Sequence, residues 1–395
     1  MVEGFEAVRP VAERTPRDEP PRSSADADRG GLTVDQLSET QLIARFAPHL
    51  RAHEPGGGSR YEILGPGDDC AVVAAPDGRF VISTDTQVQG QDFQLTWPNG
   101  VVSTGFDTGH KCATQNLADV AAMGAVPSSL VVSLTLPGRT SVRWVEDFAR
   151  GLRAGAIACG AVHCGIVGGD LGRGGEISAT ATVTGDLEGR APIRRNGARP
   201  GDLVALAGTV GRSAAGLDLL QDPSTKGTVE PHLVELMDNQ LRPVSPTPLG
   251  AQLAEAGATA MIDVSDGLVR DLTRVAEASD VVVDLDPAAL DDLARPLAAA
   301  GERLGRDPLY WVLHGGEDHG LLSTVPAGTR LPHGARPLGS VRAVPPGWGA
   351  TVVVTTGTAR ESVADRVRVG TTPVRELPAE LRGRGWDHFE PEDGV

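Results

Sequence analysis

The chain has 395 residues, which is enough for two or three domains with a substantial hydrophobic core. Its 36 basic and 52 acidic residues give a formal charge of −16, and an acidic surface repels nucleic acid and anionic lipid. No apolar run approaches the roughly 20 residues that cross a bilayer. We therefore expect neither nucleic acid nor a membrane among its partners.

The first 32 residues are rich in Pro, Arg, Asp and Ser and lack apolar periodicity, which predicts a disordered tail. The same segment lacks the apolar core of a secretory signal, so we expect a cytoplasmic protein. No pair of the four cysteines has CxxC spacing. Cys159, His163 and Cys164 could form a metal site, but buried small side chains are the commoner role, because no second ligand pair accompanies them.

The first predicted element is a helix over residues 34–50, for which Thr33 is a suitable N-cap. Two short strands follow, over 71–75 and 79–84, and are expected to pair as a hairpin. The rest of the first half is predicted to contain a helix over 108–123, a strand over 130–136, a helix over 142–159, and strands over 162–167 and 177–185.

The second half begins after a linker over residues 194–201. Strands are predicted over 203–207 and 260–264, and helices from 213, over 248–256 and from 266, with short strands beyond 330. Strands and helices mix without a regular βαβ rhythm, which favours an α+β fold over a doubly wound sheet. We expect three parts, namely the tail (1–32), an N-terminal domain (33–189) and a C-terminal domain (190–395).

Aspartates in glycine-rich turns at strand ends form the most informative pattern. Taken alone, most of these segments are better explained as an ordinary turn or a helix cap. Together they offer the hard oxygen ligands that Mg²⁺ prefers and backbone N–H groups that bind phosphate, so the spacing leaves turns and a magnesium–nucleotide site as open alternatives. The segments are Gly67-Asp68-Asp69, Ser83-Thr84-Asp85-Thr86, Gly168-Gly169-Asp170, Asp263-Val-Ser265-Asp266-Gly267 and Gly315-Gly316-Glu317-Asp318.

Asp119 lies outside these five segments, within an apolar helical stretch. A buried carboxylate needs a cation or hydrogen-bond donors, and Asn116 and Lys111 lie on the same helical face. The chain has no GxxxxGK[ST], no GxGxxG after a strand, no HExxH and no GxSxG, which argues against the enzymes that those motifs mark. The histidines, His319 among them, are scattered and are expected to be structural or peripheral.

Taken in order, these motifs resemble those of the thiamine-monophosphate kinases, in the superfamily of aminoimidazole ribonucleotide synthase and selenophosphate synthetase. The resemblance extends from about Thr33 to Phe389. The matching segments are 67–71, 83–86, 111–125, 168–170, 195–202, 261–268, 315–318 and a C-terminal Gly385-Trp-Asp-His-Phe389.

The resemblance implies ATP-dependent phosphorylation of thiamine monophosphate to thiamine diphosphate, the last step in making that cofactor. Transfer in the family is direct and in line, with several Mg²⁺ ions and no phosphoenzyme. The implied fold is α+β and like that of aminoimidazole ribonucleotide synthase, with an N-terminal mixed sheet and helices that bind ATP and Mg²⁺, and a C-terminal α/β sandwich. A homodimer through the N-terminal domains is implied too.

The resemblance also assigns roles by position. The implied catalytic residues are Asp119, Asp170 and Asp266. The aromatic ring of Trp386 suits contact with a cationic thiazolium ring. The implied metal ligands are Asp69, Ser83, Thr84, Asp85, Asp119, Asp170, Asp263 and Asp266. The implied ATP contacts are Gly169, Asp170, Arg195 and Ser265. The implied substrate contacts are Asp92, Glu317 and Trp386.

The chain departs from the family pattern at two places. Asp92 stands where many members have His, and Gly316-Glu-Asp-His-Gly-Leu321 replaces a more usual Glu-Asp-Tyr-Glu-Leu. Two alternatives remain, namely another ATP-dependent enzyme of the superfamily, such as one like aminoimidazole ribonucleotide synthase, and a catalytically silent nucleotide-binding regulator. The full set of acidic residues argues against the regulator, because binding alone does not require so many metal ligands.

Overall fold

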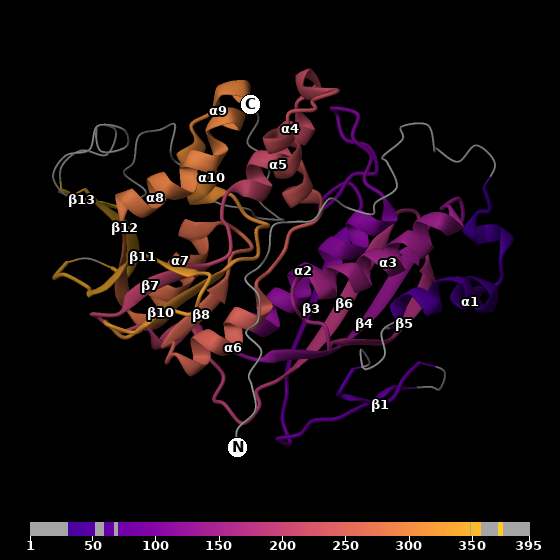
Figure 1. The fold of residues 1–395 in the computed structure, drawn as a ribbon, viewed down its shortest axis with the longest axis horizontal. Coiled ribbons are helices and arrows are strands. Elements are labelled where there is room, and N and C mark those ends of the chain that lie inside the picture. Colours follow the sequence, from indigo (N-terminus) through magenta and orange to yellow (C-terminus); the bar gives the residue numbers. More distant parts are fainter. Residues whose placement is uncertain (1–30, 52–58, 67–69, 348, 357–369, 374–395) are drawn as a thin grey trace, which may run out of the picture.

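A computed structural model describes residues 31–51, 59–66, 70–347, 349–356 and 370–373 of the chain. They form a four-stranded and a seven-stranded sheet that lie side by side with their helices, together with a small two-stranded sheet (Figure 1). Helices and strands do not alternate regularly along the chain. The α+β class predicted from the sequence is confirmed.

The four-stranded sheet comes from the first half of the chain and has the strand order β3-β6-β4-β5. β4 and β5 are parallel and the other two pairs are antiparallel, so the mixed sheet expected for this half is present. Burial alternates along most of β6, as in a sheet with one covered face. The strands are β3 (Val81–Val88), β4 (Val126–Leu136), β5 (Gly165–Arg173) and β6 (Ser178–Asp186).

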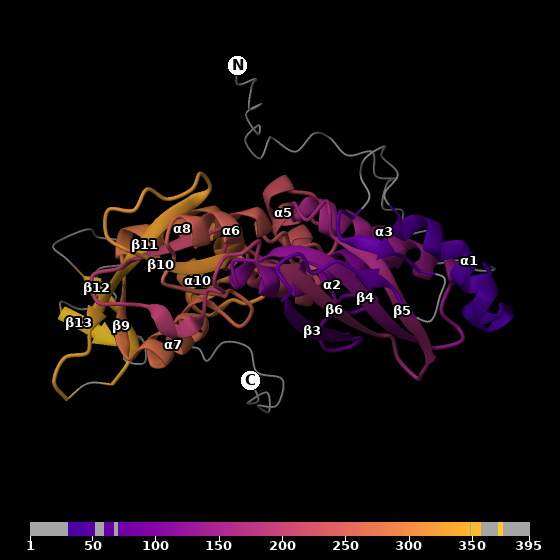
Figure 2. The same ribbon diagram turned by 90° about the horizontal axis from the view of Figure 1, so that it is seen from below.

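Two helices, α2 (Gly105–Ala122) and α3 (Val142–Ala158), cover one face of this sheet (Figure 2). Side chains of both helices and of β4 and β6 form one hydrophobic cluster. On the opposite face, which we call the outer face, Ile82 and Val131 are 63% and 38% exposed. The sheet therefore has a packed inner face and an outer face that keeps apolar side chains in contact with solvent.

The seven-stranded sheet has the order β13-β12-β9-β11-β7-β10-β8, and a large hydrophobic cluster joins its strands to the helices of the second half. This is the layered arrangement expected there. The strands are β7 (Leu203–Ala207), β8 (Ala260–Asp263), β9 (Val281–Leu285), β10 (Leu321–Val325), β11 (Ala335–Ala343), β12 (Thr351–Thr356) and β13 (Gly370–Pro373). The helices are α4 (Arg212–Gln221), α5 (Pro231–Leu241), α6 (Thr247–Glu255), α7 (Leu268–Ser279), α8 (Pro287–Ala294), α9 (Ala298–Leu304) and α10 (Pro308–His314).

The single helix predicted over residues 34–50 is wrong. Thr33 precedes a short 3₁₀ turn over Val34–Gln36, and the α-helix α1 (Glu39–Leu50) starts after Ser38. Ser38 makes the reciprocal capping bonds with Gln41, 3.3 Å to its backbone nitrogen and 2.9 Å to its side-chain oxygen. This second, stronger cap resets the start of the helix.

The predicted hairpin over residues 71–84 is also wrong. β2 (Val72–Val73) pairs with β1 (Glu62–Leu64), whereas β3 pairs with β6 over eight residues, a much longer set of backbone hydrogen bonds. The antiparallel pairing with β6 extends β3 beyond residue 84, its predicted end. The parallel pairing with β4 likewise extends β5 beyond residue 167. Asp85 and Asp170 therefore lie inside strands and not in turns at strand ends.

A third hydrophobic cluster joins the two halves of the molecule. Ala121 and Ala122 at the end of α2 pack with Leu253 of α6, Met261 of β8 and Leu321 of β10. The division into domains at residue 190 stays a prediction. The predicted tail lies almost entirely outside the described residues, in which no helix is long and apolar enough to cross a membrane.

Candidate active site

The first part of the site lies between β3 and the middle of α2. Ser83 and Asp85 face α2, because alternate residues of a strand point to the same side. The Ser83 hydroxyl donates to Asp119 Oδ2, and the Asp85 backbone N–H donates to Asn116 Oδ1 at 3.2 Å. The strand and the helix therefore hold the carboxylates of Asp85 and Asp119 on the inner face of the sheet.

A third carboxylate, Asp263, comes from the other sheet, at the end of β8, and is 4% exposed. Burial, then the charges of Asp263 and Asp85, raise the pKa of Asp119 to about 7. Burial also raises the pKa of Asp85, and the charge of His319 opposes this rise. The three carboxylates thus lie close enough to act on one another where water is largely excluded.

His319 lies beside these carboxylates and is 3% exposed. Its Nδ1 atom is 3.4 Å from Asp263 Oδ2. Burial opposes protonation of the ring, but the hydrogen bond with Asp263 and the charges of Glu317 and Asp263 outweigh it, so the pKa of His319 is raised. Of the two roles expected for His319, structural or peripheral, the peripheral one is excluded by its burial beside Asp263, and no sequence pattern links the two residues.

One buried side chain, Asp271, holds the turn that follows β8. Its Oδ2 atom accepts hydrogen bonds of 3.0–3.1 Å from the backbone N–H groups of Ser265, Asp266 and Gly267. Burial, followed by the charges of neighbouring carboxylates, raises the pKa of Asp271 to about 7. Gly267 has a φ of 121°, which side-chain-bearing residues rarely adopt, so the turn requires glycine.

The loop over residues 315–320 lies against this turn through backbone hydrogen bonds. The Glu317 N–H donates to Ser265 O and the His319 N–H donates to Val264 O, both at 2.9 Å. Glu317 and His319 have φ values of 66° and 51°, which are unfavourable for residues other than glycine. The backbone hydrogen bonds hold both residues in these conformations next to Asp263 and the following turn.

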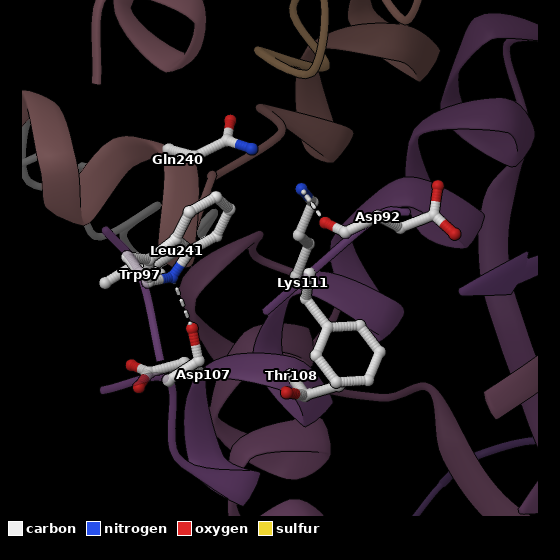
Figure 3. A pocket seen from close by; sticks show the side chains of 9 residues that line it. Asp92, Trp97, Asp107, Thr108, Lys111, Gln240 and Leu241 are labelled. Atoms are coloured by element: carbon white, nitrogen blue, oxygen red, sulfur yellow. Dashed lines mark hydrogen bonds between the residues drawn. The ribbon is translucent and has the colours of Figure 1, made fainter. Parts of the chain in front are cut away.

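A buried ion pair links α2 to this loop. Lys111 is 3% exposed, and its Nζ atom lies 2.8 Å from Glu317 Oε2 and donates to Asp92 O at 3.1 Å. Figure 3 shows Lys111 pointing between Asp92 and Gln240 on the wall of a small pocket. Two predicted substrate residues, Asp92 and Glu317, therefore meet at one lysine. The Asp92 carboxylate itself accepts a backbone hydrogen bond from the end of β3.

Two of the predicted metal ligands lie on the outer face of the four-stranded sheet. The Thr84 side chain is on that face because it alternates with Ser83 and Asp85, and it donates to a backbone carbonyl of β6. Asp170 is exposed on β5 and is in register with Ser133, which is also exposed. The structure thus does not bring the Thr84 hydroxyl or the Asp170 carboxylate to Asp119.

The described residues contain no group of three or more His, Cys, Asp or Glu side chains that could hold a metal ion by themselves. The donors nevertheless fit Mg²⁺, because Asp85 and Asp119 offer partly buried carboxylate oxygens whose pKa values are raised, first by burial and then by neighbouring carboxylates. Mg²⁺ is commonly bound through one or two carboxylates together with substrate phosphates. A site completed by phosphates is therefore compatible with this arrangement.

Comparison with known proteins identifies the family. The family described as AIR synthase related protein, N-terminal domain, matches residues 67–187. The thiamine-monophosphate kinase of Mycobacterium tuberculosis (strain CDC 1551 / Oshkosh) is 43% identical over 302 residues, which cover 75% of this chain and 85% of that protein. The chain belongs to the thiamine-monophosphate kinase family.

Solved structures of thiamine-monophosphate kinases have the same fold. The crystal structure from Stenotrophomonas maltophilia K279a has a TM-score of 0.65 at 31% identity and covers 80% of this chain and 96% of that one. The structure of AaThiL complexed with AMPPCP and TMP has a TM-score of 0.62 at 29% identity, covering 82% of this chain and 95% of that one. The fold expected from the sequence is confirmed.

The other residues predicted for a thiamine-monophosphate kinase site are spread more widely. Gly169 lies in β5 beside Asp170. Arg195 is exposed in a 3₁₀ turn, and its carbonyl accepts a hydrogen bond from Ser279 of α7. Asp69 and Trp386 lie outside the described residues, so their roles stay predictions.

The sequence assigned no role to Asp271 and Arg274, which contact the site of this family member, and it offered Lys111 only as a possible cation for Asp119. Lys111 pairs with Glu317, and both Asp271 and Arg274 contact Asp266. Lys111 lies two turns before Asp119 on one helix face, and Asp271 lies in the first turn of the helix after Gly267. These spacings indicate that the side chains lie near the site. Only the folded chain shows which partner each of them has.

Proposed function

We propose that this chain transfers the γ-phosphoryl group of ATP directly to the phosphate of thiamine monophosphate, giving thiamine diphosphate. The observation that carries the proposal is that Asp85 of β3, Asp119 of α2 and Asp263 of β8 lie close enough for their charges to affect one another, in a member of the thiamine-monophosphate kinase family. AaThiL has been solved with AMPPCP and TMP, which supports the same pair of substrates here.

The charge of the site agrees with this reaction. Donor and acceptor are both phosphates, so the main barrier to be lowered is repulsion between two anions. When bound, Mg²⁺ supplies positive charge between the carboxylates and the phosphates. The residues that would hold it are Asp85, Asp119, Asp263 and Asp266, with Ser83 orienting Asp119 through its hydroxyl.

No strong general base is needed, because an ionised phosphate oxygen of thiamine monophosphate is already the nucleophile. The proteinʼs task is to align the two phosphates in line and to neutralise their charge. We assign Glu317 to the cationic thiazolium ring, since its carboxylate is 33% exposed beside the pocket and is fixed by Lys111. Asp92 borders the same pocket.

The remaining assignments rest on the resemblance alone. Asp69 is proposed to complete the metal ligands, whereas Thr84 and Asp170 lie on the outer face and are not assigned to that site. Gly169, Arg195 and Ser265 are proposed to contact ATP, and Trp386 to stack on the thiazolium. We also propose a homodimer through the outer face of the four-stranded sheet. Support comes from the exposed apolar side chains Ile82 and Val131 on that face.

The test is incubation of the purified chain with Mg-ATP and thiamine monophosphate, with detection of thiamine diphosphate. Asp119→Asn should reduce turnover by about 100-fold or more, because the site loses a carboxylate that would hold the Mg²⁺ whose charge offsets that of the phosphates. Asp292→Asn is the matched control, since Asp292 is 61% exposed on α8 and should leave turnover unchanged. ATP binding without product would favour a silent regulator, and ATP cleavage with a different acceptor would favour another superfamily enzyme.

A further inference from the structure

Arg274 on α7 is bound to the Asp266 carboxylate. Its Nη2 atom donates to Asp266 Oδ2, and its Nη1 atom lies 2.6 Å from Asp271 Oδ1. Arg270, one turn earlier on the same helix, places its Nε atom 3.9 Å from the same Asp266 oxygen. One carboxylate oxygen of the candidate site therefore faces two guanidinium groups of one helix face.

The pair between Arg274 and Asp266 can separate without unfolding the turn after β8. The two side chains are 35% and 22% exposed, and ion pairs this accessible to water are weak. Asp271 is fully buried, and its other oxygen keeps three backbone hydrogen bonds that do not involve Arg274. The turn is thus held by Asp271. The Arg274 guanidinium can therefore leave the Asp266 carboxylate without disrupting the turn.

The Arg274 guanidinium weakens the binding of a small divalent cation to the Asp266 oxygen that accepts from it. The two groups carry the same sign of charge next to one oxygen, and the hydrogen bond already uses one of its lone pairs. We propose that Arg274 competes with the divalent cation for Asp266 and thereby sets the cation concentration at which the site fills. This inference rests on the proposed role of Asp266 as a metal ligand.

The test measures binding of Mn²⁺ alone to the full chain, from the free Mn²⁺ signal in electron paramagnetic resonance. Arg274→Gln should tighten Mn²⁺ binding by roughly 3- to 10-fold, because it frees Asp266 from a partly exposed ion pair. Arg274→Lys keeps the charge but loses the two-pronged contact, so an intermediate tightening is expected. Circular dichroism melting verifies that both variants are folded.

Arg270→Gln is the matched control, because it removes the same charge from the same helix, and the Arg270 Nε atom is 3.9 Å from the Asp266 oxygen that Arg274 contacts directly. It should change Mn²⁺ binding by less than about 2-fold. Equal tightening of Mn²⁺ binding in both glutamine variants would show a general charge effect and would overturn the proposed competition. Unchanged or weaker Mn²⁺ binding in Arg274→Gln would overturn it too.

Asp266→Asn separates this inference from the proposed function. Weaker Mn²⁺ binding is expected if Asp266 is a ligand. Unchanged binding would remove Asp266 from the metal site and would overturn the competition with it. Formation of thiamine diphosphate by the unaltered chain would still decide the proposed activity independently.

Discussion

At the scale of single residues, the candidate site is a group of acids whose charges are only partly balanced by the protein. Asp119 has a Ser83 hydroxyl as its hydrogen-bond donor but also faces the charges of Asp263 and Asp85. Asp266 differs, because Arg274 supplies a direct counter-charge. Cations bound at the site should therefore raise the free energy of unfolding, because they offset the repulsion among these carboxylates.

Asp119→Asn should stabilise the cation-free protein although it removes activity. The pKa of Asp119 is raised from 3.8 to about 7, so the folded state holds a proton that the unfolded state releases. The contribution of this proton to the free energy of unfolding is fully present below about pH 4 and is lost as the pH rises to about 7. Asparagine stays neutral, so the variant should be about 1–2 kcal/mol more stable than the unaltered chain at pH 8.

Urea unfolding in EDTA at pH 5 and pH 8 checks this prediction. The advantage of the variant should grow from the lower to the higher pH, and an excess of Mg²⁺ with AMPPCP should reduce it. A variant that is less stable than the unaltered chain at pH 8 would contradict the argument from charge.

At the scale of elements, α2 carries the site and α3 supports α2. The two helices lie unusually close, because a Cβ on Gly109 would lie 2.1 Å from Phe148 O and one on Gly151 would lie 2.0 Å from Phe106 O. Neither distance is possible for a real side chain. The spacing of the helices, and with it the position of Asp119 against β3, therefore depends on these glycines.

Gly151→Ala should force α3 away from α2 and lower the free energy of unfolding by about 1–3 kcal/mol, the usual cost of overpacking. The better helix propensity of alanine offsets only part of this loss. Gly175→Ala is the control, because nothing lies within 4 Å of the position of its Cβ. Equal denaturant midpoints for the two variants would show that the close approach is not needed.

At the scale of the whole molecule, the site exists only where the two halves of the chain meet. Lys111 of α2 reaches Glu317 of the second half, and Arg242 at the end of α5 lies 3.4 Å from Asp107 of α2. Lys111, Asp107 and Arg242 are buried, so loss of the partner of any of them would leave a costly unpaired charge. They hold the halves in the arrangement that brings Asp263 to Asp119.

The proposed homodimer is tested on the outer face of the four-stranded sheet. Ile82→Glu should give a monomer in light scattering coupled to size-exclusion chromatography, because a charge would be buried in an apolar contact. Ile157→Glu on α3 is the control, since Ile157 is 50% exposed but lies outside that face. A dimer that survives Ile82→Glu, or is lost equally in Ile157→Glu, would contradict an interface at the outer face.

The sequence by itself determined the fold class, the family and most elements of both sheets, because burial patterns and ordered motifs are local and can be counted along the chain. Through the resemblance to a family, it also predicted that Asp85, Asp119 and Asp263 belong to one site. Only the tertiary structure decided that Asp170 faces away from them, since the face of a strand residue depends on register. It likewise decided that Lys111, His319 and Arg274 join the site, because their partners lie far away along the chain or belong to loops whose packing no local pattern specifies.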